Sequence, residues 1–469
     1  DASAGGAQTH SFVANGAITA GDLVSLLADG KVSTTVSSIT DLVEFTANNP
    51  AQIAAAYDTN LNKVVVVYSD STNSTYGTAV VGTVAGGSIT FGTPVVFNSA
   101  HTFYSSVVFD SATNKIVISY RDGSNSYYGT AIVATVSGTS ISFGTAAVFE
   151  SALIAYTSIA FDSNTGDVVI AYVDQANSNK GTGVVGVVSG TDISFGTPAL
   201  FEDGATGQVV IAFDVNAAKM VIAYTDAVSD GHAIVGTVSG TDISFGTAVV
   251  FETDTTTYPA IVYDPDSLKV VVAYNSSASG GTSLVGTISG TDISFGAKTV
   301  MNSNVTYGTH TTYDTTLNKV IVHYRYSSAA GMVNIGTVSG TTISFSAEQV
   351  IHLGNPQAYL PAIYDPDSNR TILFYETAST GVVTLFNAAL VNTTGDWVGI
   401  ADADTANAAG CPVRLLGSVA SGQTSLTINS TYYLQRGGTL AATVLADREI
   451  GRAVSATEIL ITQSNVALG

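Results

Sequence analysis

Aspartates that return at a regular spacing are the first residues of this 469-residue chain whose type could do chemistry. Each follows an aromatic residue, and successive members lie 50 to 52 residues apart: Asp58, Asp110, Asp162, Asp214, Asp264, Asp314 and Asp365. Carboxylates are ligands for Ca²⁺, but an aspartate at the start of a turn more often accepts hydrogen bonds from the backbone N–H groups of that turn. We therefore predict turn capping for these seven residues and no bound metal.

A second group of aspartates lies two residues beyond a repeated tyrosine, at Asp70, Asp122, Asp174 and Asp226. We predict solvated carboxylates in surface loops there, with weak Ca²⁺ or saccharide contact as the alternative. The repeated tyrosines themselves end apolar runs and are predicted to pack in the interior, as is His323. They are Tyr68, Tyr120, Tyr172, Tyr224, Tyr274, Tyr324 and Tyr375.

Catalytic chemistry has little support. Glycoside hydrolysis requires two carboxylates at a set separation, yet glutamates are scarce and the arginines between residues 35 and 393 are only Arg121, Arg325 and Arg370. No zinc-binding spacing, phosphate-binding loop or Ser–His–Asp pattern is present. The lone cysteine, Cys411, is predicted to be a small buried residue. We predict that the protein is not an enzyme and uses no cofactor.

Tyrosines are the residue type best suited to hold a ligand. One set is expected to form an aromatic collar at the mouth of a central channel: Tyr104, Tyr156, Tyr258, Tyr307 and Tyr359. A second set is placed on loops at the same end: Tyr127, Tyr128, Arg325 and Tyr326. Aromatic rings pack on the C–H-rich faces of sugars, although packing between repeats would explain the collar tyrosines as well.

An internal repeat predicts the elements that position these residues. A phrase close to S-G-T-x-I-S-F-G-T recurs with its phenylalanine at 91, 143, 195, 245, 295 and 345. Within one unit, residues 258–263, 269–274, 283–288 and 292–296 read as four short strands joined by turns. Four strands at a period near 50 residues are typical of propeller blades. The predicted fold is all-β, a seven-bladed β-propeller over residues 35–393.

The last unit lacks the fourth phrase after residue 391. A matching segment, Ser38 to Thr46, stands before the first unit, so an N-terminal strand is predicted to complete the last blade. The remaining flanks, 1–34 and 394–469, are predicted to meet in one small β domain into which the propeller is inserted. This domain includes a hairpin with Asp29-Gly30 as its turn and strands at 397–401, 413–419, 432–440 and 450–454.

The flanks carry the segments ITAGDLVSLLADGKV, WVGIADAD, LLGSVASGQTSLTINSTYYLQRGGTL and IGRAVSATEILI. Their order resembles a module of structural proteins of tailed bacteriophages, including tail fibres and head-decoration proteins. The resemblance covers the flanks alone and implies attachment to a particle. It transfers no catalytic residue.

Charge and connectivity extend this interpretation. With 15 basic against 36 acidic residues and a net charge of −21, nucleic acid and membrane insertion are not expected. The flanking domain replaces one turn of the last blade, so it is expected under the propeller face that carries this turn. The variable loops are expected on the opposite face, facing away from the flanking domain.

We predict a virion structural protein that anchors through its base and presents the propeller to a host-surface glycan or protein. A homo-oligomer on a virion or cell surface is expected. The alternatives are a bacterial surface or filament-forming adhesin and a purely structural decoration protein.

Overall fold

A computed structural model describes the ring of repeats almost throughout: residues 40, 42–85, 87–326, 330–346, 348–353, 360–377 and 379–388. In the flanks it describes ten short strands. The chain divides into two compact units, one made of residues 1–41 and 386–469 and the other of residues 42–385. The sequence had placed these divisions at 34/35 and 393/394. Each unit is described by itself below.

The first three repeats form one 13-stranded sheet in which each repeat contributes four antiparallel strands and β17 adds a thirteenth by pairing with β15. The strands are β5 (Pro50–Asp58), β6 (Lys63–Asp70), β7 (Tyr76–Ala85), β8 (Ser88–Phe91), β9 (Val95–Asp110), β10 (Lys115–Asp122), β11 (Tyr128–Ser137), β12 (Ser140–Phe143), β13 (Ala147–Asp162), β14 (Asp167–Asp174), β15 (Lys180–Ser189), β16 (Asp192–Phe195) and β17 (Ala199–Ala205). Two short 3-10 helices, Ser71–Asn73 and Gln175–Asn177, follow β6 and β14. The long strands β9 and β13 join the repeats, because each pairs with the outer side of one repeat and then begins the next.

Four separate sheets continue the series in the orders β18-β19-β20-β21, β23-β24-β25-β26, β28-β29-β30-β31 and β33-β34-β35-β4. Their bounds are β18 (Val209–Asp214), β19 (Lys219–Thr225), β20 (Gly231–Ser239), β21 (Asp242–Phe245), β22 (Val249–Glu252), β23 (Thr256–Asp264), β24 (Lys269–Ser276), β25 (Gly280–Ser289), β26 (Asp292–Phe295), β27 (Thr299–Asn302), β28 (Thr306–Asp314), β29 (Lys319–Tyr326), β30 (Ala330–Ser339), β31 (Thr342–Phe345), β32 (Gln349–Leu353), β33 (Ala362–Asp365), β34 (Arg370–Glu376), β35 (Gly381–Phe386) and β4 (Val43–Thr46). The outer strand of a repeat is interrupted, since β26 and β27 both pair with β25.

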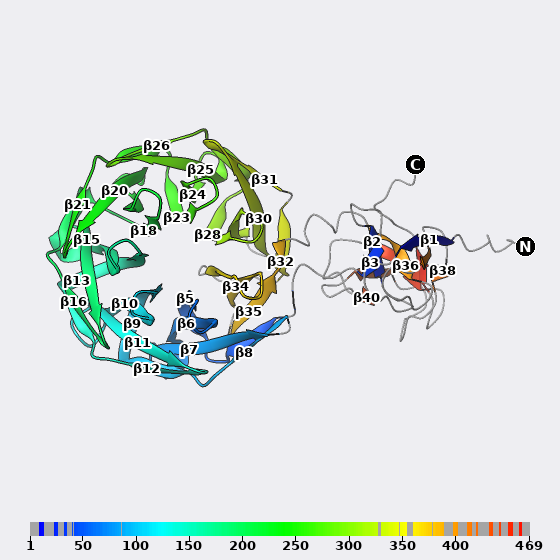
Figure 1. Cartoon of the computed structure of the whole chain (residues 1–469), viewed down its shortest axis with the longest axis horizontal. Helices are drawn as coiled ribbons and strands as arrows, with labels where there is room; N and C mark the ends of the chain where they lie inside the picture. Colours follow the sequence, from blue (N-terminus) through cyan, green and yellow to red (C-terminus); the bar gives the residue numbers. More distant parts are fainter. Residues whose placement is uncertain are drawn as a thin grey trace, which may run out of the picture. The chain divides into compact units, whose positions relative to one another are not determined.

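The four-stranded units lie around a common axis, each with its first strand innermost and its short fourth strand at the rim (Figure 1). The innermost strands contact one another in sequence, from β5 through β9, β13, β18, β23 and β28 to β33, and β33 contacts β5. An all-β, propeller-like architecture of repeated four-stranded sheets is therefore confirmed.

Aromatic packing joins most repeats to the next along what we call the seam, and Met301 and Ile351 stand at the two junctions without the phenylalanine. The ring of Phe251, on the outer strand of one repeat, lies 5.1 Å from Tyr274 on the second strand of the following repeat. The pairs Phe97–Tyr120, Phe149–Tyr172 and Phe201–Tyr224 pack in the same way. All seven repeated tyrosines are fully buried, which confirms their predicted packing role.

Glycines in the repeated phrase allow this close approach. A Cβ placed on Gly296 would lie 1.7 Å from the carbonyl oxygen of Thr341, in the turn of the next repeat. Gly196 meets Thr241 in the same way, at 1.8 Å. The glycine after the repeated phenylalanine is thus required because the backbone of the neighbouring repeat occupies the space of a side chain.

The last repeat takes its outer strand from β4, which pairs with β35 through Val43↔Val383 and Gly381↔Thr46. Phe45 of β4 packs 5.7 Å from Tyr68 of the first repeat, the same seam contact as between consecutive repeats. An N-terminal strand therefore completes the last sheet, as predicted. The paired residues correspond only to the second half of the other outer strands.

The repeated aspartates cap turns, as predicted. Asp264 accepts hydrogen bonds from the backbone N–H groups of Asp266 and Ser267 at 2.9 and 3.1 Å, and the other six accept at least one such bond. The second group was predicted wrongly for three of its four members, since Asp226 is partly exposed. Asp70, Asp122 and Asp174 are buried rather than solvated, because they too cap the loop that follows them.

The other unit contains two five-stranded sheets, β1-β37-β36-β2-β3 and β38-β42-β41-β39-β40. The first combines strands from both ends of the chain: β1 (Thr9–Val13), β2 (Leu23–Leu26), β3 (Val32–Thr34), β36 (Trp397–Ala401) and β37 (Gly410–Arg414). The second consists of β38 (Val419–Ala420), β39 (Thr431–Leu434), β40 (Leu440–Ala441), β41 (Glu449–Ala453) and β42 (Ile459–Ile461).

The strands of this unit can be compared with those predicted for the flanks. β2 and β3 form the predicted hairpin, while its Asp29-Gly30 turn and the side chain of Cys411 lie outside the described residues. Of the strand expected at 413–419, the first two residues belong to β37 and Val419 begins β38, while residues 415–418 lie outside the described residues. No helix among the described residues is long and apolar enough to cross a bilayer.

Candidate functional site: a tyrosine-lined central cavity

A cavity of about 460 Å³ is lined by segments of the innermost strands. Each of five such strands carries a β-bulge at the same place, for example between Ala155 and Ser158 of β13 and between Thr257 and Ala260 of β23. The first residue of each bulge has a left-handed φ between 49° and 58°: Gln52, Tyr104, Tyr156, Tyr258 and Gly308. All five line the cavity, so the bulge directs this one position into it.

Three of the five bulge residues are tyrosines, for which a left-handed backbone is costly, roughly 1–2 kcal/mol per residue. Only Gly308 is the residue type that adopts it freely. Because the fold accepts glycine here, the large side chains of Tyr104, Tyr156 and Tyr258 are not demanded by the backbone. Such strain concentrates at functional sites.

Hydrogen bonds hold Tyr104 and Tyr258 in place across the boundaries between repeats. The side-chain oxygen of Gln208 accepts from the backbone N–H of Tyr258 at 2.6 Å, and Gln52 accepts in the same way from Tyr104. The hydroxyl of Thr157 donates to the carbonyl oxygen of Tyr104. The wall is therefore preorganised by contacts between neighbouring repeats.

The predicted collar is present in part. The rings of Tyr104 and Tyr156 lie 4.8 Å apart, and both line the cavity together with Tyr258. Tyr307 lies one residue before the bulge position and packs 5.9 Å from Tyr258, but it is not among the described lining residues. Tyr359 lies outside the described residues.

No carboxylate and no lysine or arginine is found among the described residues that line the cavity. His310 is the one imidazole there, and partial loss of water contact beside the surrounding protein lowers its pKa. Its Nδ1 accepts from the backbone N–H of Ala362 at 3.4 Å. His323, opposite it in the sheet, is fully buried, as predicted for a core residue. The cavity wall is uncharged and rich in hydroxyl and amide groups.

An aromatic cluster around Arg121 adjoins the cavity. The guanidinium lies 4.5 Å from the ring centre of Phe103, 4.8 Å from Tyr104 and 5.1 Å from Tyr127. Tyr127 is 39% exposed, and Tyr128 begins β11 beside it. Tyr104 thus belongs both to the cavity and to this cluster.

Two of the expected loop residues lie in a strand instead. Arg325 and Tyr326 continue β29, because Arg325 pairs with Gly331 and Tyr326 with Ala330. Arg325 stacks on Tyr307 at 4.8 Å, as Arg121 stacks on Tyr104. The side chain of Tyr326 lies outside the described residues. Likewise, Tyr128 is a strand residue at the start of β11, whereas Tyr127 precedes that strand.

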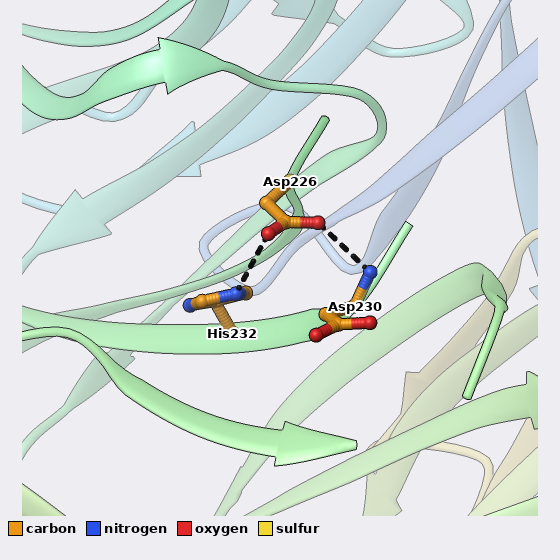
Figure 2. Close-up of side chains that lie close together, drawn as sticks. All are labelled: Asp226, Asp230 and His232. Atoms are coloured by element: carbon orange, nitrogen blue, oxygen red, sulfur yellow. Dashed lines mark hydrogen bonds and ion pairs between the residues drawn. The ribbon is translucent and has the colours of Figure 1, made fainter. Parts of the chain in front are cut away.

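A separate group of polar side chains, Asp226, Asp230 and His232, lies beyond the end of β19 (Figure 2). Asp226 accepts from the backbone N–H groups of Val228 and Asp230 at 3.0 and 2.9 Å. Its other oxygen lies 3.3 Å from Nε2 of His232. Their ligand atoms lie within 4.8 Å of one another, yet the bonds of Asp226 are those of a loop cap like Asp70.

Sequence reasoning missed Gln52, Gln208 and Arg121 as site residues. A signal existed for the glutamines, because they stand where other repeats carry Tyr104, Tyr156 and Tyr258, at the same 50- or 52-residue spacing. Arg121 directly follows a seam tyrosine, as Arg325 does. Nothing in the sequence indicated that Phe103 and Tyr127 would enclose it.

No family model and no curated protein matches the chain. Among solved structures, the ring is similar to the BP39L lectin from Burkholderia pseudomallei, at 12% identity and a TM-score of 0.57, covering 72% of this chain and 97% of the lectin. AofleA from Arthrobotrys oligospora matches at 10% identity, with a TM-score of 0.43, over 69% and 94% of the two chains. The intramolecular trans-sialidase from Ruminococcus gnavus matches at 9% identity with a TM-score of 0.45, and the match covers 75% of this chain and 98% of the trans-sialidase.

Proposed function

We propose that the ring is a seven-bladed β-propeller that binds a saccharide at its central cavity. The observation that carries the proposal is the set of three tyrosines held with left-handed backbone around one cavity. A cavity of about 460 Å³ falls in the range of small-molecule sites. Tyrosine rings pack on sugar faces, while amide and hydroxyl groups bond to sugar hydroxyls. The lectin of similar fold is consistent with this use.

We favour binding over hydrolysis. Glycosidases place two carboxylates across the scissile bond, and the described lining residues include none. Glu376, whose pKa burial raises to about 7, has the protonation behaviour of a general acid, but it is not among those lining residues. A cavity of this composition can hold a sugar without supplying the acid and the base.

We propose further that the unit formed by the flanks attaches the propeller to a particle, as a fibre, spike or decoration protein of a virion. The resemblance of the flanks to tailed-phage modules supports this. The alternatives are a bacterial surface or filament-forming adhesin and a purely structural decoration protein. Weak single sites would gain avidity from many copies on one particle. Imaging of the native assembly separates a shell, a tail and a cell-borne filament, and we expect subunit contacts through residues 1–34 and 394–469.

A glycan array tests the binding function directly. The intact protein should bind a defined set of glycans, and replacing Tyr104, Tyr156 and Tyr258 together with Ala should abolish that binding. Tyr76→Ala is the matched control, because Tyr76 is not among the described lining residues. Thermal melting of each variant shows that it is folded. A folded triple variant that binds as the parent does would contradict the proposal.

A further inference from the structure

The basic side chains of the propeller fall into two groups. Most begin the second strand of a repeat, beside the turn-capping aspartates: Lys63, Lys115, Lys219, Lys269, Lys319 and Arg370. At the opposite end of the strands, Lys180 pairs with Asp203 at 2.6 Å and Lys298 with Glu252 at 2.8 Å. Arg121 lies at this second end and differs from both lysines.

Within the part of the chain that the structure describes, no carboxylate lies within ion-pairing distance of Arg121. Its Nε is buried without a hydrogen-bond partner, and Nη1 makes one long bond of 3.3 Å to the carbonyl oxygen of Ile154. In a chain of net charge −21, a half-buried arginine without a carboxylate is unexpected, because a desolvated charge is costly unless it is paired.

The surrounding rings hold the guanidinium in position. Phe103, Tyr104 and Tyr127 each lie close to it, and stacking on the faces of a guanidinium leaves its terminal Nη groups to bond to a carboxylate. Removal of water by these neighbours lowers the pKa of Arg121, yet an arginine stays protonated at any physiological pH. The positive charge is therefore permanent and rigidly placed.

We propose that the saccharide bound at the cavity is acidic, with its carboxylate on Arg121 and its ring on Tyr104. This rests on the proposed function and adds the chemical class of the ligand. Tyr104 connects the two parts, since it lines the cavity and also stacks on Arg121. An anionic sugar supplies the negative charge that no described carboxylate of the protein provides to Arg121.

Two pairs of probes isolate the carboxylate: trigalacturonate and its methyl ester, and 3′-sialyllactose and its methyl ester. Esterification removes the charge and leaves the sugar rings unchanged. In calorimetric titration of the full chain, at least one acid should bind about tenfold or more tightly than its ester, since charge-assisted hydrogen bonds are about twice as strong as neutral ones. Arg121→Gln should abolish this preference, and Arg121→Lys should retain part of it.

Arg370→Gln serves as the control, because it removes an arginine at the other end of the strands and should leave the preference intact. If Arg121→Gln fails to fold, the ester comparison on the parent and on Arg121→Lys still decides. Equal binding of acid and ester, or binding of neutral array glycans alone, overturns this inference and leaves the saccharide function standing. Binding of no glycan overturns both.

Discussion

Two sets of residues that are neighbours in every repeat behave in opposite ways. The seam tyrosine is the same in all seven repeats and is fully buried each time. The residue directly after it changes around the ring: Ser69, Arg121, Val173, Thr225, Asn275, Arg325 and Glu376. The bulge position varies similarly, between tyrosine, glutamine and glycine.

The difference separates what the fold requires from what it permits. Every seam must join two repeats with a similar spacing, so the same residue types recur: the tyrosine in all seven repeats, and the phenylalanine and the glycine in five each. Met301 and Ile351 stand at the other two phenylalanine positions, and Ser346 stands in place of the sixth glycine. Side chains in the cavity wall do not have to pack against a residue that recurs in every repeat. They are therefore free to differ between repeats while the backbone stays the same. Variation on a constant backbone is where a ligand site can develop.

Removal of the seam between the last repeat and the first should have the largest effect on folding stability. Deleting residues 1–46 removes β4 with Phe45 and exposes the edge of β35. We expect loss of cooperative folding, or a melting temperature many degrees lower, measured by circular dichroism. A truncated protein that melted like the parent would show that the last seam is not equivalent to the others.

Single seam phenylalanines should be equivalent to one another. Phe45→Ala and Phe251→Ala each remove a buried ring from a tyrosine of the next repeat. We expect each to lower the free energy of unfolding by about 3–5 kcal/mol, as measured by urea denaturation. A much smaller loss for Phe45→Ala would mean that closure is weaker than the internal seams.

The seam glycine should be less tolerant than a turn glycine. Gly296→Ala forces a Cβ against the backbone of Thr341, and we expect a loss of about 3 kcal/mol. Gly290→Ala is the control: it has open space but a φ of +67°, so about 1 kcal/mol is expected. Equal losses in the two variants would remove the steric explanation for the repeated glycine.

Glu376 occupies the variable position directly after a seam tyrosine, and the pH dependence of stability tests its environment. Burial raises its pKa from 4.5 to about 7, so between these values the folded protein keeps a proton that the unfolded chain loses. The free energy of unfolding should therefore fall as the pH rises from about 4.5 to 7. Glu376→Gln should remove this part of the decline in melting temperature, whereas exposed Glu44→Gln should not. Parallel profiles for parent and Glu376→Gln would refute the assignment.

The bulge tyrosine should matter least for stability. Tyr156→Asn replaces a strained ring with a residue that accepts left-handed backbone, so the free energy of unfolding should change by only about 1 kcal/mol or less. Glycan binding should weaken at the same time. A loss as large as that of Phe251→Ala would place Tyr156 with the seam.

Much of the fold could be read from residue spacing. The repeat placed the four strands of each unit, the capping role of residues such as Asp264, and the outer strand supplied from before the first repeat. These features depend on local turn chemistry and on contacts that recur in every unit, and both leave a periodic trace in the sequence. The interior role of the seam tyrosines was predictable for the same reason.

The site was only partly predictable, because bulges and neighbours decide it. The β-bulge in β23 directs Tyr258 into the cavity. In β28 the bulge residue is Gly308, so Tyr307, one residue earlier, is not among the described lining residues. Asp70 looked like a solvated loop residue, yet it is buried under the loop it caps. The sequence alone determined the repeated scaffold, since strand pattern and turns are local. Only the tertiary structure decided which side chains meet around Arg121 and the cavity, since those contacts join different repeats.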